Sequence, residues 1–247
     1  MKRFALALAL GFATSQLLYS AEIDKESRAI VEKAIEAHGG QDALKKYVAG
    51  KTTVKGNMSM FKMDVPFSGE VLHALPEQLK MQLSFEIAQQ KIKLVQTING
   101  KSIATTVNGE VKKLSDEEKA ELKQALLIQE VSALLPLLEG KKFTVKALKD
   151  GKVGDAPVSV IRVSAEGMID TDFAFDKKTG LMVKSSRQAL SETGAKVLEE
   201  SVMSDYKKSG GVLIPMKVVV TRDGEKFMTM TITEAKVLDK IDPKEFE

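Results

Sequence analysis

Apolar and polar side chains alternate along residues 78–87, which read QLKMQLSFEI. This period of two predicts an antiparallel strand with one buried and one solvated face. The same pattern recurs between turn residues such as Asn99-Gly100 and Asp223-Gly224. It predicts about eleven strands. They are expected from residue 51 onward and then near 65–75, 78–87, 92–98, 143–148, 158–164, 168–175, 181–190, 197–206, 212–222 and 227–238.

Two segments have the helical period instead. Residues 24–38 carry apolar side chains three and four positions apart, Asp24 can cap the start, and Gly39-Gly40 can end the helix. Residues 115–135 begin with Ser115 and Glu118, the spacing of a capping box, and continue with a wide apolar face up to Pro136.

These elements predict a single domain over residues 22–247, because no linker or change of composition divides them. The fold class is mainly β (α+β). A sheet of about eleven antiparallel strands must curl, and its inner face needs a cover. The two amphipathic segments are the available cover. We therefore expect an N-terminal helix and a mid-chain lid helix on the concave side of the sheet.

The first residues have the order of an export signal. Lys2 and Arg3 precede an apolar stretch at 4–13 that is shorter than the roughly twenty residues needed to span a bilayer. We expect residues 1–21 to be a signal peptide and the protein to be periplasmic. The chain contains no cysteine, which a lipoprotein needs at its mature N-terminus, so we expect it to be soluble and not lipid-anchored.

The charge balance gives no basic footprint for nucleic acid. The whole chain has a net charge of +3, and Lys2 and Arg3 within the expected signal account for two of these charges. A nearly neutral domain is not typical of a nucleic-acid partner.

Candidate chemistry is sparse. His38 and His73 lie on separate elements without the usual spacing of zinc ligands. Asp170, Asp172 and Asp176 surround one strand, but Asp170 and Asp172 fall on its wet face. No phosphate-binding loop, dinucleotide fingerprint or nucleophile elbow occurs. We expect no metal, no cofactor and no enzymatic activity.

The chain contains eleven methionines and no tryptophan. Methionine adapts to irregular apolar partners. Each single methionine fits an ordinary core, but several fall on apolar strand faces, which favours a soft cavity lining. The candidate lipid-binding residues are Met81, Leu83, Phe85, Leu94, Phe173, Phe175, Met216, Val218, Met228 and Met230, with Leu127, Val131 and Leu134 of the lid helix facing them.

Three segments resemble the LolA-like periplasmic carriers, the outer-membrane lipoprotein-sorting proteins. They are AIVEKAIEAHGGQDALKK (29–46), FAFDKKTGLMVKSS (173–186) and SDYKKSGGVLIPMKVVVTRDG (204–224), the last with a D-Y-x-x-x-x-G-x-x-x-P pattern at Asp205, Tyr206, Gly211 and Pro215. The resemblance implies an unclosed eleven-stranded β-barrel, plugged by helices around an apolar cavity for acyl chains.

Carriers of that family also use an arginine latch between barrel and lid. None of the four arginines beyond the expected signal stands in a motif that matches the latch; they are Arg28, Arg162, Arg187 and Arg222.

Two functions remain open at this point. The first is a monomeric carrier of lipid or lipoprotein acyl chains, delivering them to the outer membrane with a membrane-bound donor or acceptor protein. The second is a regulatory protein of the same fold that senses such ligands without transporting them.

Overall fold

The computed structural model describes residues 23–247 except 61–62, 88 and 192–193. The expected signal peptide therefore lies outside the described residues. The described chain forms one antiparallel sheet of thirteen strands in the order β6-β5-β4-β3-β2-β1-β13-β12-β11-β10-β9-β8-β7. The strands are β1 (Ala49–Met60), β2 (Met63–Ala74), β3 (Gln78–Ile87), β4 (Gln90–Asn99), β5 (Ser102–Val107), β6 (Glu110–Val111), β7 (Thr144–Val153), β8 (Ala156–Ser164), β9 (Thr171–Asp176), β10 (Met182–Leu190), β11 (Lys196–Ser209), β12 (Val212–Arg222) and β13 (Glu225–Leu238).

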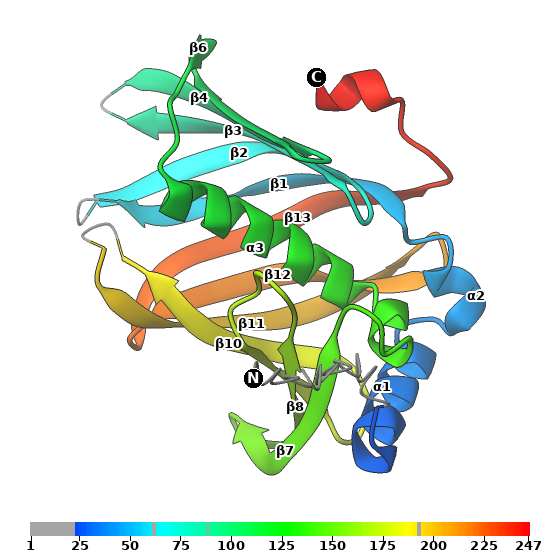
Figure 1. Cartoon of the computed structure of the whole chain (residues 1–247). Coiled ribbons are helices and arrows are strands. Elements are labelled where there is room, and N and C mark those ends of the chain that lie inside the picture. Colours follow the sequence, from blue (N-terminus) through cyan, green and yellow to red (C-terminus); the bar gives the residue numbers. More distant parts are fainter. Residues whose placement is uncertain (1–22, 61–62, 88, 192–193) are drawn as a thin grey trace, which may run out of the picture.

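The sheet curls strongly and does not close, because β6 and β7 are its two edges (Figure 1). This confirms the predicted half-barrel. The expected number of about eleven strands was too low by the short pair β5 and β6. The turns Asn99-Gly100 and Asn108-Gly109 signalled this pair, but β6 has two residues and shows no alternation of its own.

Two helices precede the sheet, α1 (Lys25–Ala37) and α2 (Gln41–Leu44). Asp24 caps α1 by accepting a hydrogen bond from the Ser27 amide at 2.9 Å. Ser27 accepts a hydrogen bond from the Ala147 amide at 2.6 Å, so α1 is joined to the edge strand β7. An edge strand covered in this way is protected from pairing with another chain.

The end of α1 is fixed against the turn between β11 and β12. Gly39 has φ +124°, and a Cβ there would lie 2.3 Å from the Gly211 carbonyl oxygen. The neighbouring His38 carbonyl accepts a hydrogen bond from the Leu213 amide at 2.9 Å. A glycine is required at position 39 both by its backbone angle and by this close approach.

The mid-chain helix α3 (Asp116–Ser132) crosses the concave side of the sheet (Figure 1). Its capping box is formed as predicted, with Ser115 and Glu118 bonded to each other's backbone amides. The helix ends before the predicted boundary at Pro136. Leu134 takes φ +61°, and Pro136 lies within the following 3-10 turn η1 (Leu135–Leu138).

The core has two parts. The main cluster joins α1, the C-terminal half of α3, η1 and the inner face of the sheet; Val31, Val131, Leu134, Leu137 and Phe173 are fully buried there. A smaller cluster joins the N-terminal half of α3 to β3 and β4; it contains Leu79, Ile98, Leu122 and Leu126. The space between α3 and the middle of the sheet is less completely filled.

Candidate functional site

A cavity of about 420 Å³ lies between α3 and the inner face of the sheet. This volume is within the range of roughly 300–1,000 Å³ found for small-molecule sites. Its walls come from β1, β2, β3 and β10 to β13. Its roof is one face of α3, formed by Ala125, Ile128, Gln129 and Ser132.

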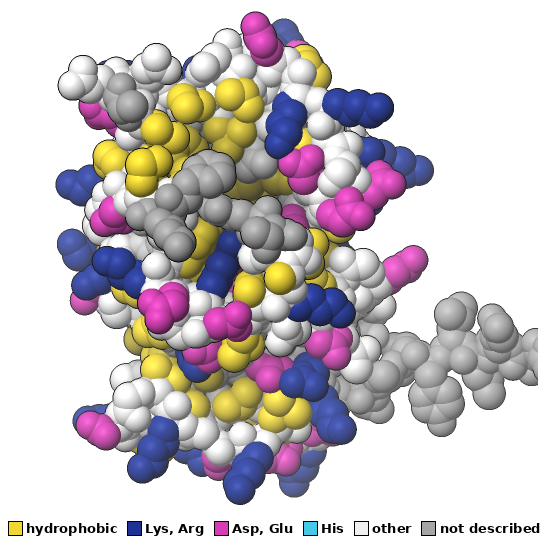
Figure 2. Space-filling view, turned by 90° about the vertical axis from the view of Figure 1, so that its left-hand side faces the viewer, with side chains coloured by type: hydrophobic (Ala, Val, Ile, Leu, Met, Phe, Trp, Pro, Cys, Tyr) yellow, Lys and Arg dark blue, Asp and Glu magenta, His cyan; other side chains and the backbone are white. Residues whose placement is uncertain are grey.

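The floor of the cavity is apolar. Val218 pairs with Met230 and Val220 pairs with Met228 across β12 and β13, and all four residues line the cavity. Met81 contributes from β3. Unbranched thioether side chains leave a surface that can adapt to flexible apolar partners. On the face shown in Figure 2, apolar side chains gather in a hollow with charged side chains around it.

The wall changes character along β11. Glu199, Ser201, Met203 and Tyr206 of this strand all line the cavity. The lining positions are odd-numbered as far as Met203 and even-numbered at Tyr206. The change occurs at Asp205, which has φ +57° and is passed over in the pairing with β12. This irregularity turns Tyr206 into the cavity, where simple alternation would place Asp205. The D-Y part of the recognised pattern therefore has a structural explanation.

Four polar rings form the end of the cavity near α1 and α2. The His38 ring lies edge-on to Tyr206, with 5.8 Å between centroids, and the His73 ring lies 5.2 Å from that of Tyr47. The Tyr206 hydroxyl donates to the Met182 carbonyl, and Gln129 of α3 donates to the Tyr47 hydroxyl at 3.3 Å. These contacts hold the rings in fixed orientations.

Burial keeps both histidines of this end neutral. Burial lowers the pKa of His38, although the hydrogen bond to the Ala34 carbonyl acts to raise it. Burial also lowers the pKa of His73 to about 4. His73 Nε2 is buried and has no hydrogen-bond partner among the described residues. An unpartnered buried polar atom costs free energy, and a ligand group that pairs with it would recover that cost.

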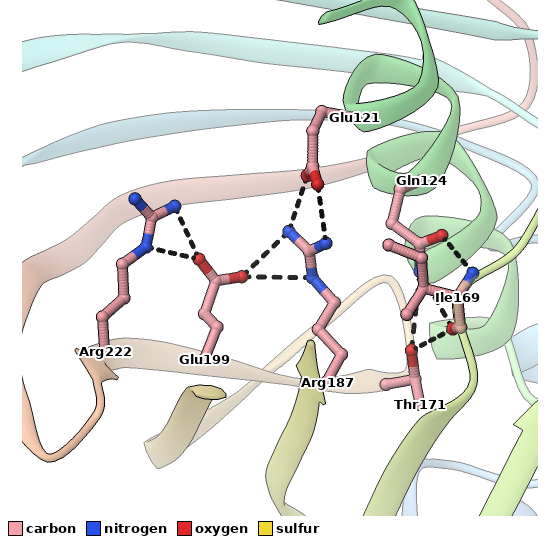
Figure 3. A network of polar contacts seen from close by, with 7 residues as sticks. All are labelled: Glu121, Gln124, Ile169, Thr171, Arg187, Glu199 and Arg222. Carbon is pink, nitrogen blue, oxygen red and sulfur yellow. Dashed lines mark hydrogen bonds and ion pairs between the residues drawn. The ribbon is translucent and has the colours of Figure 1, made fainter. Parts of the chain in front are cut away.

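A charged network lies farther along β11 (Figure 3). Arg187 of β10 donates to Glu199 at 2.9 Å and to Glu121 of α3 at 2.9 and 3.3 Å. Glu199 also accepts from Arg222 at 2.8 and 3.0 Å. Burial opposes the charge of Arg187, but its hydrogen bonds to Glu121 and the nearby carboxylates raise its pKa. Arg187 and Glu199 both line the cavity.

A neutral contact beside this network also holds α3 (Figure 3). Gln124 of α3 is buried, and its side-chain oxygen accepts from the Ile169 amide at 2.9 Å. Its amide nitrogen lies 3.5 Å from the Thr171 hydroxyl. The N-terminal half of α3 is thus joined to the sheet by one ionic and one neutral polar contact.

Of the thirteen candidate lipid-binding residues, four line the cavity: Met81, Val218, Met228 and Met230. The other nine lie in the main core or pack against it, and Phe175 also borders a smaller pocket beside α1; they are Leu83, Phe85, Leu94, Leu127, Val131, Leu134, Phe173, Phe175 and Met216. Strand alternation marks side chains that point inward. It does not separate those under α3 from those that α1 and η1 cover.

Sequence reasoning missed the polar wall residues. His38 and His73 were noted only as lacking the spacing of zinc ligands, and Arg187 was not matched to a latch; all three line the cavity. Among the described residues there is no group of three or more potential metal ligands, and no helix is both long and apolar enough to cross a bilayer.

No family model matches the sequence, and no curated protein matches it. Solved structures match its fold over 90% of this chain and 97% of theirs. One is a domain described as an outer-membrane lipoprotein-sorting protein from Vibrio parahaemolyticus, with 12% identity and a TM-score of 0.57. Others are a LolA superfamily protein from Nitrosomonas europaea (10%, 0.58) and a DUF1329 family protein from Desulfovibrio piger (11%, 0.57). The chain therefore has the LolA-like fold.

Proposed function

We propose that the protein is a periplasmic carrier that holds the acyl chain of a lipid or lipoprotein in the cavity under α3 for delivery to the outer membrane. The observation that carries this proposal is the apolar cavity itself, lined by Met81, Met228, Met230 and Val218 and roofed by a helix. Transfer of an acyl chain from water to such a surface is favourable by roughly 0.8 kcal/mol per buried methylene group.

Several features support a carrier that binds reversibly. The roof is held to the sheet partly by polar contacts at Glu121 and Gln124, which can be exchanged for water when α3 moves. The fold is the one found in the lipoprotein-sorting domain from Vibrio parahaemolyticus. In this proposal the protein works as an exported, soluble monomer, takes its ligand from a membrane-bound donor and performs no catalytic step.

The test fills the cavity. We expect Val218→Trp to weaken binding of a fluorescent fatty-acyl probe about tenfold or more, because the indole occupies space that the chain needs. Val219→Trp is the matched control. Val219 is the next residue of β12, is half-buried and does not line the cavity, so this variant should bind like the wild type.

Lipid extraction and native mass spectrometry of protein purified from the periplasm would identify the bound chain. Absence of lipid from the purified protein, together with no probe binding by the wild type, would contradict the proposal. Transfer of the probe to acceptor vesicles separates the two functions. Tight binding without transfer would favour the sensing protein.

A further inference from the structure

Arg187 is an unusual group in the wall of an apolar cavity. Its side chain is 12% exposed and lies among two carboxylates, Glu199 and Glu121. A guanidinium withdrawn from water in this way is tolerated because both carboxylates are hydrogen-bonded to it. The two partners differ in origin, since Glu199 belongs to the sheet and Glu121 belongs to α3.

The network balances its charges only when Glu121 is in place. Glu199 is shared, because Arg222 donates to its second oxygen at 2.8 Å. Two arginines therefore face two carboxylates while α3 is closed. If Glu121 is withdrawn, the same two arginines share one carboxylate, and an unpaired positive charge remains in a half-buried wall. That charge is costly to leave without an anion.

Opening of the roof to admit a chain would also move Glu121. Ala125, Gln129 and Ser132 of the roof follow Glu121 along α3 at intervals of three and four residues, so they share its face of the helix. A displacement of α3 that opens the roof therefore also pulls Glu121 away from Arg187. The vacated position borders the cavity, because Arg187 and Glu199 are both part of its wall.

We propose that the cavity selects amphiphiles with an anionic headgroup, a carboxylate or a phosphate, which replaces Glu121 on Arg187. The planar guanidinium matches either group through paired hydrogen bonds. The anionic headgroup and Glu121 then exclude each other, so a bound ligand holds α3 away from its closed contact. This proposal rests on the function proposed above, because it requires an acyl chain in the cavity.

The test compares ligands with the same chain and different headgroups. The probes are myristate, a myristoyl lysophosphatidic acid and the neutral 1-monomyristoyl glycerol, and the measured quantity is the ratio of neutral to anionic Kd. In wild type this ratio should exceed one. Glu121→Gln removes the contact that every entering chain must break, so it should tighten the anionic and the neutral probes by a similar factor and leave the ratio near its wild-type value.

Two further variants test the role of Arg187 and provide a control. Arg187→Gln should bring the ratio to near one, whereas Glu117→Gln should leave it at the wild-type value, because Glu117 is an exposed carboxylate in the first turn of α3. The double variant with Arg187→Gln and Glu121→Gln removes both charges of this contact, so it gives the same test if Arg187→Gln alone fails to fold.

A last measurement uses inorganic phosphate, which has no acyl chain. It should not raise the melting temperature of Glu121→Gln. A rise equal to that produced by the lysophosphatidic acid would show a free-anion site and overturn the headgroup proposal. A wild-type Kd ratio of about one, or a ratio that loss of the Arg187 charge does not lower, would also overturn it, while leaving acyl-chain binding intact. Failure of all three lipids to bind would overturn the proposed function and the headgroup proposal together.

Discussion

At the scale of single residues, His73 shows how the cavity wall controls charge. Burial lowers the pKa of this imidazole to about 4, while an unfolded chain has the ordinary value of 6.5. Between these two values the unfolded chain binds a proton that the folded chain does not. The free energy of unfolding linked to His73 is therefore fully present above about pH 6.5 and decreases as the pH falls toward 4.

We expect the wild type to lose about 2 kcal/mol of unfolding free energy between pH 7.5 and pH 5 through His73. His38 acts in the same direction, since burial lowers its pKa also. Chemical denaturation across this range checks the expectation. His73→Gln should flatten most of the slope whatever its absolute stability. An unchanged slope in that variant would mean that His73 takes up its proton in the folded state as readily as in the unfolded chain.

A second prediction at this scale separates cavity from core. Met230 lines the cavity, whereas Phe173 is fully buried in the main cluster. Phe173→Ala should cost roughly 3–5 kcal/mol of stability and leave the acyl-chain affinity of the folded fraction unchanged. Met230→Ala should cost less than roughly 2 kcal/mol and weaken binding, because its side chain already faces open space. Equal costs and equal affinities in the two variants would contradict this division.

At the scale of elements, α3 forms the roof of the cavity. Its start was predictable from Ser115 and Glu118, because a capping box is a local signal. Its contact with Arg187 was not, since Arg187 lies 12 residues from Glu199 and 66 residues from Glu121 in the sequence. Strand periods likewise predicted most of the sheet but not which inward side chains α1, α3 or η1 cover.

Removal of the cap should loosen this helix selectively. Ser115→Ala deletes the side chain that accepts from the Glu118 amide, and such a loss typically costs about 1 kcal/mol. We expect faster amide hydrogen exchange over residues 116–121 and faster entry of an acyl probe, because the first turns of α3 open more often. Ser115→Thr keeps a capping hydroxyl and is the control. Faster exchange without faster entry would show that opening of these turns does not control access to the cavity.

At the scale of the whole molecule, the two ends of the cavity differ. Near α1 the wall is fixed, because Gly39 lies against the Gly211 backbone and His38 is bonded to Leu213. The other end carries the ionic contact between Arg187 and α3. Along β11 these ends are marked by Tyr206 and Glu199, which at roughly 3.3 Å per residue are about 23 Å apart. An elongated ligand can therefore lie in the cavity in either of two directions, and in the proposal above the ionic end is the one that opens.

The tyrosines make that direction visible by fluorescence. The sequence has no tryptophan and three tyrosines; Tyr19 lies in the expected signal peptide, and Tyr47 and Tyr206 both line the fixed end of the cavity. The intrinsic tyrosine emission of a chain that lacks residues 1–21 would thus come from that wall alone. If the methyl end of an acyl chain enters first, bromine near the methyl end should quench this emission more strongly than bromine beside the headgroup. The reverse order of quenching would mean that the headgroup lies against the rings.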